Sequence, residues 1–112
     1  MTIRQREIGD VVVLDIDGKM TGGLDSDLFQ NTVQALLEAG KHKLLVNLEN
    51  VKWINSTGLG VLIASFSTVQ KSGGKLKLLH VSERIQGLLA ITRLSTIFES
   101  YQQEDQAVAS FA

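Results

Sequence analysis

Two spacings of apolar residues alternate along the chain. Short, nearly continuous apolar runs are typical of buried strands, whereas apolar residues that recur every three or four positions are typical of a helix with one buried face. The runs predict strands at residues 11–16, at 43–48 with a continuation at 51–54, and at 75–81, with a more polar strand at 2–7 and a short edge strand at 96–98. The helical spacing predicts helices at residues 24–37, 57–71, 82–91 and 103–111.

The order of these elements predicts a mixed β-sheet. The strands at 2–7 and 11–16 are separated by the turn dipeptide Gly9-Asp10, so they are expected to form an antiparallel hairpin. The later strands alternate with helices, which favours parallel pairing. We therefore expect an α/β (α+β) fold with helices packed against a mixed sheet of four to five strands. No proline, internal repeat or low-complexity linker divides residues 1–112, so a single domain is expected.

Local residue types predict how the helices end and which faces they bury. Gly40 stands where a C-terminal cap is expected, and Ser82 is predicted to be an N-cap. The first helix is expected to bury Leu24, Leu28, Val33, Leu36 and Leu37. The third is expected to bury Ile85, Leu88, Leu89 and Ile91.

Composition and charge limit the classes of partner. The chain has 112 residues, 44% of them hydrophobic, and its net charge of −1 comes from charges spread along its length. No clustered basic face of the kind that binds nucleic acid is predicted. Lys71, Lys75 and Lys77 are expected to form a solvated rim or, alternatively, a patch that meets an acidic partner. No apolar run approaches the roughly 20 residues of a membrane helix, and no signal peptide is recognised, so we expect a cytoplasmic protein without a membrane segment.

The polar tripeptide Asn55-Ser56-Thr57 lies where a predicted strand passes into the second helix. Side chains of these types can accept hydrogen bonds from the first helical N–H groups, so the tripeptide is either a plain helix cap or a functional turn. Gly58 and Gly60 follow, although each costs roughly 1 kcal/mol relative to alanine inside a helix. They indicate either close packing on the sheet or a surface that another molecule approaches.

Motifs for catalysis, metal binding or nucleotide binding are not found. The chain has no cysteine, its two histidines lack metal-ligand spacing, and no phosphate-binding glycine pattern is complete. Ser56 with His80 as its base does not match a nucleophile elbow, and we expect His80 to be a half-buried strand residue. The four aspartates between residues 15 and 27 lack the glycine and final glutamate of a calcium loop. We therefore predict no catalytic residue, no metal and no cofactor.

One stretch resembles a known family. The run LENVKWINSTGLGVL, residues 48–62, resembles the signature of bacterial anti-sigma factor antagonists, the STAS domain family. VVLDIDGKM at 12–20, GGKLKL at 73–78 and IQGLLAITRL at 85–94 resemble other parts of the same family. The resemblance covers nearly the whole chain and implies a stand-alone STAS domain.

The resemblance also implies a function and a site. In this family the serine that matches Ser56 is phosphorylated by an anti-sigma factor with serine kinase activity. The unphosphorylated antagonist binds that partner and frees the sigma factor, and a serine phosphatase resets the cycle. Ser56 is therefore the expected phosphorylation site, with Thr57 as second choice. The expected partner-binding residues are Asn55, Ser56, Thr57, Gly58, Leu59 and Gly60.

One position departs from the family pattern. Asn55 stands where the family usually has aspartate directly before the phosphorylated serine, so the cap geometry is kept and a charge is lost. Trp53 and Ile54 are expected to pack in the core or at its rim rather than to contact a partner. The alternative function is a constitutive STAS subunit of a transport ATPase or a stress-signalling complex, in which Ser56 serves only as a cap. The sequence does not predict the oligomeric state.

Overall fold

Five strands form one sheet in the order β1-β2-β3-β4-β5, and the computed structural model describes all residues, 1–112. The strands are β1 (Thr2–Ile8), β2 (Val11–Met20), β3 (Lys43–Ile54), β4 (Lys75–Leu79) and β5 (Ser100–Tyr101). The helices are α1 (Leu24–Glu38), α2 (Ser56–Lys71), α3 (Glu83–Ile91) and α4 (Glu104–Ala109), with a short 3-10 helix, η1, at Leu94–Thr96.

The sheet is mixed, as predicted. β1 pairs with β2 antiparallel across the turn at Gly9, whose φ of 60° suits glycine, and every later neighbour pair is parallel. An antiparallel pair needs only a tight turn, whereas each parallel pair needs a longer crossover, which α1, α2 and α3 supply. The predicted α/β (α+β) class is confirmed, and the sheet has five strands.

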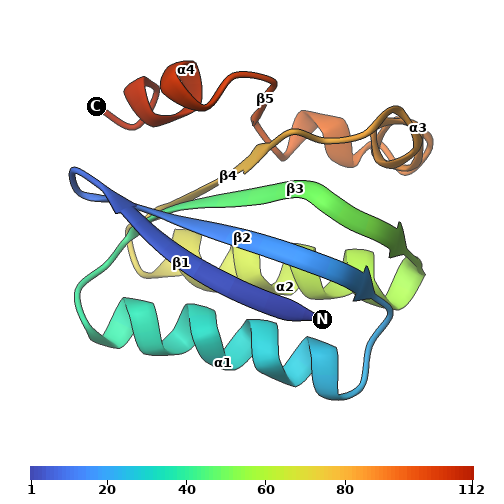
Figure 1. The fold of residues 1–112 in the computed structure, drawn as a ribbon, viewed down its shortest axis with the longest axis horizontal. Coiled ribbons are helices and arrows are strands. Elements are labelled where there is room, and N and C mark those ends of the chain that lie inside the picture. The colour runs from blue at the N-terminus through green and yellow to red at the C-terminus, as the bar shows by residue number, and fades with distance from the viewer.

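α1 and α2 lie side by side against one face of the sheet (Figure 1). Alternate residues of the central strands point toward these helices, and Leu14, Val46 and Leu78 are fully buried there. Phe29 of α1 and Leu62 of α2 meet them from the helices and are equally buried. This main core holds the end of β3 and the start of α2 in a fixed position.

α4 covers part of the opposite face of the sheet. Its Ala107, with Phe111 just beyond it, packs on a smaller apolar cluster that includes Val13 and Leu45. Lys77 lies beneath the same segment, 3% exposed, with its Nζ donating to the Ser110 carbonyl at 2.9 Å. The expectation that Lys77 belongs to a solvated rim or an exposed patch is wrong, because α4 closes over it.

The predicted edge strand at 96–98 is also wrong. Arg93, with a φ of 62°, ends α3, and residues 94–96 form η1 instead. Phe98 then turns inward, 4% exposed, and its ring meets Phe66 edge to face with centroids 5.2 Å apart. Pairing with β4 therefore begins later, at β5.

The predicted buried faces of α1 and α3 need correction at three residues. Leu24 is 87% exposed and Leu28 is 42% exposed, whereas Phe29, next to Leu28, is fully buried and occupies the core position. The buried row of α1 is Phe29, Val33 and Leu36. In α3, Ile91 at the last helical position is 83% exposed, whereas Ile85 and Leu89 are buried as expected.

Candidate functional site

The turn between β3 and α2 is built by Asn55. Its extended backbone, with φ −110° and ψ −176°, ends the strand, and its Oδ1 accepts a hydrogen bond from the Gly58 N–H at 2.8 Å. This is the geometry of an N-cap, since one of the unpaired N–H groups of the first helical turn is satisfied by a side chain. The predicted cap is confirmed, and Ser56 becomes the first residue of α2.

Asn55 makes a second contact that the sequence did not reveal. Its Nδ2 donates to the Thr21 carbonyl at 3.3 Å, and its backbone N–H donates to the Met20 carbonyl at 3.4 Å. The side chain therefore ties the loop after β2 to the start of α2. Aspartate has no donor for the Thr21 carbonyl, so asparagine has a structural reason to stand here.

Substitutions of Asn55 should separate its two hydrogen bonds. We expect Asn55→Asp to keep the cap and lose the Thr21 bond, which lowers the free energy of unfolding by about 1 kcal/mol. Asn55→Ala loses both bonds and should cost about 2 kcal/mol. Urea denaturation of wild type, Asn55→Asp and Asn55→Ala measures their free energies of unfolding, which should fall in that order. An Asn55→Asp protein as unstable as Asn55→Ala would show that the aspartate does not cap α2.

The residues that follow Asn55 divide into exposed and buried positions. Ser56, Thr57 and Gly60 are exposed, and the Ser56 hydroxyl makes no hydrogen bond within the protein. Leu59 is only 5% exposed and belongs to the main core. Three of the predicted partner-binding residues are therefore exposed to solvent: Ser56, Thr57 and Gly60.

Gly58 and Gly60 have different reasons to be glycine. A Cβ built on Gly58 would lie 1.9 Å from the Met20 carbonyl oxygen, so here the close-packing alternative holds. A Cβ on Gly60 would meet nothing within 4 Å, so packing does not require glycine there. Gly60 instead leaves an open stretch of helix backbone one turn from Ser56.

Trp53 and Leu24 present apolar surface near the turn. Trp53, in β3 shortly before Ser56, is 42% exposed, and the Arg84 guanidinium lies 4.0 Å from its ring centroid. Such a stacked cation stabilises an exposed ring modestly. Leu24 is the first residue of α1, two residues after Gly22, whose backbone approaches the Thr57 side chain closely. Ile54, by contrast, is 4% exposed and packs in the core, as expected.

The start of α2 is favourable for a negative group. The positive end of the helix dipole lies there, and no acidic residue stands in its first turn. Asn55 is neutral, so the residue next to Ser56 adds no charge that would repel an anion. The Ser56 hydroxyl is therefore exposed and free of hydrogen bonds, and it lies where the helix dipole stabilises a negative charge.

Comparison with known proteins identifies the family. The STAS domain profile matches residues 2–107. The chain belongs to the STAS domain family. The resemblance found in the sequence is therefore confirmed. The turn between β3 and α2 lies within residues 48–62 of this STAS domain, the run that most resembles the family signature.

Two kinds of relatives support the assignment. This STAS domain is 36% identical to the anti-sigma-B factor antagonist of Bacillus subtilis over 88 residues, 76% of this chain and 80% of the relative. The crystal structure of TM1081 from Thermotoga maritima matches with a TM-score of 0.88 at 25% identity, covering 97% of this chain and 93% of that one. Phosphorylated SpoIIAA from Bacillus has a TM-score of 0.76 at 14% identity over 99% of this chain and all of that one, a likeness of fold alone.

The STAS fold does not assemble the catalytic and metal-binding groups considered from the sequence. His80 is half-buried and follows β4 with a φ of 54°; its Nε2 lies 3.7 Å from Glu49 Oε2, and no hydrogen bond joins it to Ser56. Asp15 is held by Arg6 and Asn47. No three potential metal-ligating side chains come together. None of the helices combines the length and the apolar character needed to cross a bilayer.

Proposed function

We propose that this STAS domain is an anti-sigma factor antagonist that is switched by phosphorylation of Ser56. In its unphosphorylated state it binds an anti-sigma factor with serine kinase activity and so releases a sigma factor in the cytoplasm. A serine phosphatase resets it, and the protein has no catalytic activity of its own. The observation that carries the proposal is the exposed, unbonded Ser56 hydroxyl at the first position of α2. The relatives' names favour this function over a constitutive subunit of a transport ATPase.

The geometry explains why the modification changes binding more than folding. A phosphate on Ser56 adds a charge of about −1.5 to −2, and the N–H groups and dipole of α2 accommodate it without displacing a packed side chain. A partner that docks on Ser56, Thr57 and Gly60 meets a hydrated anion where it had met a small hydroxyl. A loss of 1.4 kcal/mol in that contact already lowers affinity tenfold.

The test is the mass of the protein after incubation with ATP and a candidate anti-sigma factor kinase. We expect wild type to gain one phosphate, Thr57→Ala to gain it as well, and Ser56→Ala to gain none. Ser56→Glu should bind the unphosphorylated protein's partner at least tenfold more weakly while keeping the wild-type unfolding temperature. A phosphate that still appears on Ser56→Ala would contradict the proposed switch and assign the modification to another residue.

A further inference from the structure

A β-bulge interrupts β3 shortly before its end, at the right of Figure 1, where α2 also begins. Gly18 of β2 pairs with Val51 of β3. The next residue, Lys19, pairs with Trp53, so Lys52 is an extra residue on β3. Bulges turn side chains out of the regular alternation of a strand. Lys52 and Trp53 are accordingly both exposed, although the residues on either side of them are buried.

Three basic residues adjoin Trp53. Lys19 is its cross-strand neighbour, Lys52 precedes it in the chain, and the Arg84 guanidinium lies 4.0 Å from its ring centroid. All three are exposed, and none makes an ion pair or a side-chain hydrogen bond, whereas Lys43 at the start of β3 is held by a carboxylate. We call Trp53 and these three cations the Trp53 surface. Its cations keep their hydrogen-bonding groups free for another molecule.

The Trp53 surface is arranged to receive a carboxylate. Stacking on the indole orients the Arg84 guanidinium, whose planar fork of N–H groups matches the two oxygens of a carboxylate. Glu83, its neighbour in the chain, makes no ion pair with it. α2 and α3 both begin close to this surface, capped by Asn55 and Ser82, so the positive ends of two helix dipoles add to its attraction for an anion.

The residue types of the Trp53 surface are those of binding interfaces. Tryptophan and arginine are enriched among the residues that contribute most to protein–protein affinity. Trp53 is 42% exposed, so its ring offers apolar area in the middle of the charges. An apolar centre with charges around it is the common arrangement of a protein interface.

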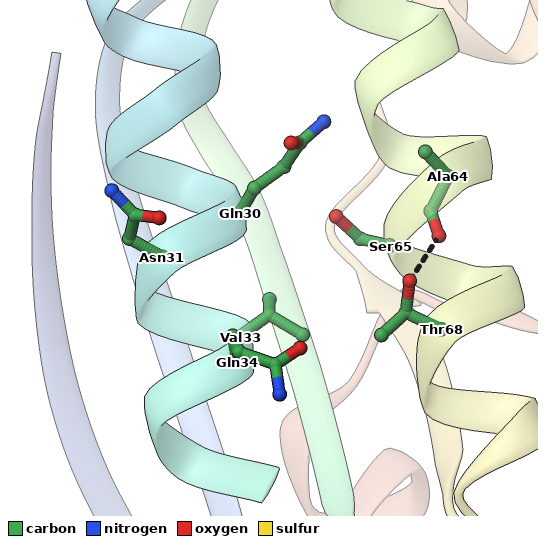
Figure 2. Close-up of a pocket in the computed structure, with 7 residues that line it drawn as sticks. All are labelled: Gln30, Asn31, Val33, Gln34, Ala64, Ser65 and Thr68. Atoms are coloured by element: carbon green, nitrogen blue, oxygen red, sulfur yellow. Dashed lines mark hydrogen bonds between the residues drawn. The ribbon is translucent and has the colours of Figure 1, made fainter. Parts of the chain in front are cut away.

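The hollow of about 250 Å³ between α1 and α2 lacks these features (Figure 2). No charged residue and no aromatic ring lines it. Its Gln30 amide is an ordinary exposed group, Asn31 points away from α2, and the Ser65 hydroxyl is closed to solvent. The hollow therefore has no charge and no accessible buried group with which to hold a partner.

We propose that the Trp53 surface is a second docking site for the anti-sigma factor and receives an acidic segment of that partner; this rests on the function proposed above. The segment's carboxylates bond Arg84 and the two lysines, and one of its apolar side chains covers the open part of the indole. Trp53 thereby gains a partner contact that the sequence did not predict. The surface continues that of the switch, since the three residues from Trp53 to Ser56 span at most about 11 Å.

This contact adds an electrostatic part to the switch. The Debye length at physiological ionic strength is about 8 Å, so the charge of a phosphate on Ser56 is only partly screened at the Trp53 surface. The phosphate repels the carboxylates of the docked segment and attracts the same cations. Phosphorylation of Ser56 therefore weakens the partner's hold on both parts of the interface.

Two peptides test the Trp53 surface without the natural partner: four repeats of Glu-Glu-Leu and four repeats of Gln-Gln-Leu. In an NMR titration at physiological salt, the acidic peptide should give saturable shifts of the Trp53 indole signal and of the amide signals of residues 19, 52 and 84. Arg84→Gln should weaken this binding about fivefold, and the neutral peptide should bind about tenfold more weakly than the acidic one.

Lys75→Gln is the matched control for Arg84→Gln. Lys75 is equally exposed and unpaired, but it lies beyond the far end of α2, whose 16 residues span about 24 Å. Because that length is about three Debye lengths, removal of its charge should change peptide binding less than about twofold.

Calorimetry with an anti-sigma factor that phosphorylates Ser56 tests the natural contact. Without ATP, Arg84→Glu and Trp53→Ala should each weaken binding about tenfold, whereas Lys75→Glu should change it less than about twofold. Thermal unfolding confirms that each variant is folded.

The two proposals fail separately. If no candidate kinase adds a phosphate to Ser56, the proposed switch fails, and the peptide titration alone decides on the Trp53 surface. The Trp53 surface is overturned if the acidic peptide gives no saturable shifts or binds no more tightly than the neutral one. It is also overturned if Arg84→Glu and Lys75→Glu change the affinity for a Ser56 kinase equally.

Discussion

Gly58→Ala is expected to destabilise the protein by about 3 kcal/mol. The added Cβ would lie 1.9 Å from the Met20 carbonyl oxygen and 2.7 Å from its carbon, so backbone atoms would have to move. Those atoms belong to the last residue of β2, and the same carbonyl accepts a hydrogen bond from the Asn55 N–H. Relief of the clash therefore pulls α2 from the sheet at the point where the helix begins. Urea denaturation monitored by circular dichroism measures the loss.

Gly60→Ala is the matched control. It makes the same change two residues later in the same helix, where the new Cβ meets nothing within 4 Å. Because alanine favours a helix over glycine, the variant should be up to about 1 kcal/mol more stable than wild type. Equal stabilities of the two variants would contradict the close approach of α2 to β2. A stable Gly60→Ala protein also allows partner binding to be measured with an altered surface beside Ser56.

Asp15→Asn is expected to lower the free energy of unfolding by about 2 kcal/mol at neutral pH. The Asp15 carboxylate, 13% exposed, accepts hydrogen bonds from Arg6 at 2.5 and 3.0 Å and from Asn47 at 2.8 Å. Arg6 in turn bonds Glu104, so this network links β1 and β2 to α4. An asparagine side chain has no negative charge to attract Arg6. It also has one acceptor oxygen instead of two, so it cannot accept all the hydrogen bonds that Arg6 and Asn47 donate to Asp15.

The effect of Asp15→Asn should depend on pH. Burial alone would raise the pKa of the Asp15 carboxyl, but the hydrogen bonds from Arg6 and Asn47 and the charges of Arg6 and Arg4 outweigh it and hold the pKa below its usual value. A lowered folded-state pKa stabilises the protein above the unfolded-state pKa of about 3.9, and this stabilisation is lost as the pH falls through the folded-state value. The difference between wild type and variant should therefore be constant above about pH 5 and shrink below pH 4.

Asp17→Asn is the control for this measurement. Asp17 lies on the same strand and the same face of the sheet as Asp15, but it is exposed and makes no side-chain hydrogen bond. The Asp17→Asn variant should have the same free energy of unfolding as wild type at neutral pH, because no side-chain hydrogen bond is lost. If Asp17→Asn lost as much stability as Asp15→Asn, the effect would come from the overall charge of the sheet face and not from the Arg6 network.

The features predicted correctly from the sequence are those that local residue order determines. Asn55 and Ser82 cap helices through bonds to residues three positions on, at 2.8 and 3.2 Å, so their role is visible in a short window. The strand periods and the hairpin turn at Gly9 are equally local. For the same reason the turn that carries Ser56 could be located before the fold was known.

The errors arose where distant segments meet. Lys77 is buried because α4, far along the chain, closes over β4, and nothing near Lys77 indicates it. The reason for glycine at position 58 is the Met20 carbonyl on another element, so the sequence left packing and partner approach equally open. The strand predicted at 96–98 is wrong because Phe98 packs against Phe66 of α2, a contact that residues near Phe98 do not indicate. Such contacts follow from tertiary packing and not from propensity.

The stacked pair of Trp53 and Arg84 gives this protein an intrinsic optical probe. Trp53 is the only tryptophan in the chain, so its emission reports one place, three residues before Ser56. Its ring is 42% exposed under the Arg84 guanidinium and is therefore sensitive to any molecule that covers it or draws the cation away. Association at this end of the molecule can accordingly be followed by fluorescence without attaching a dye.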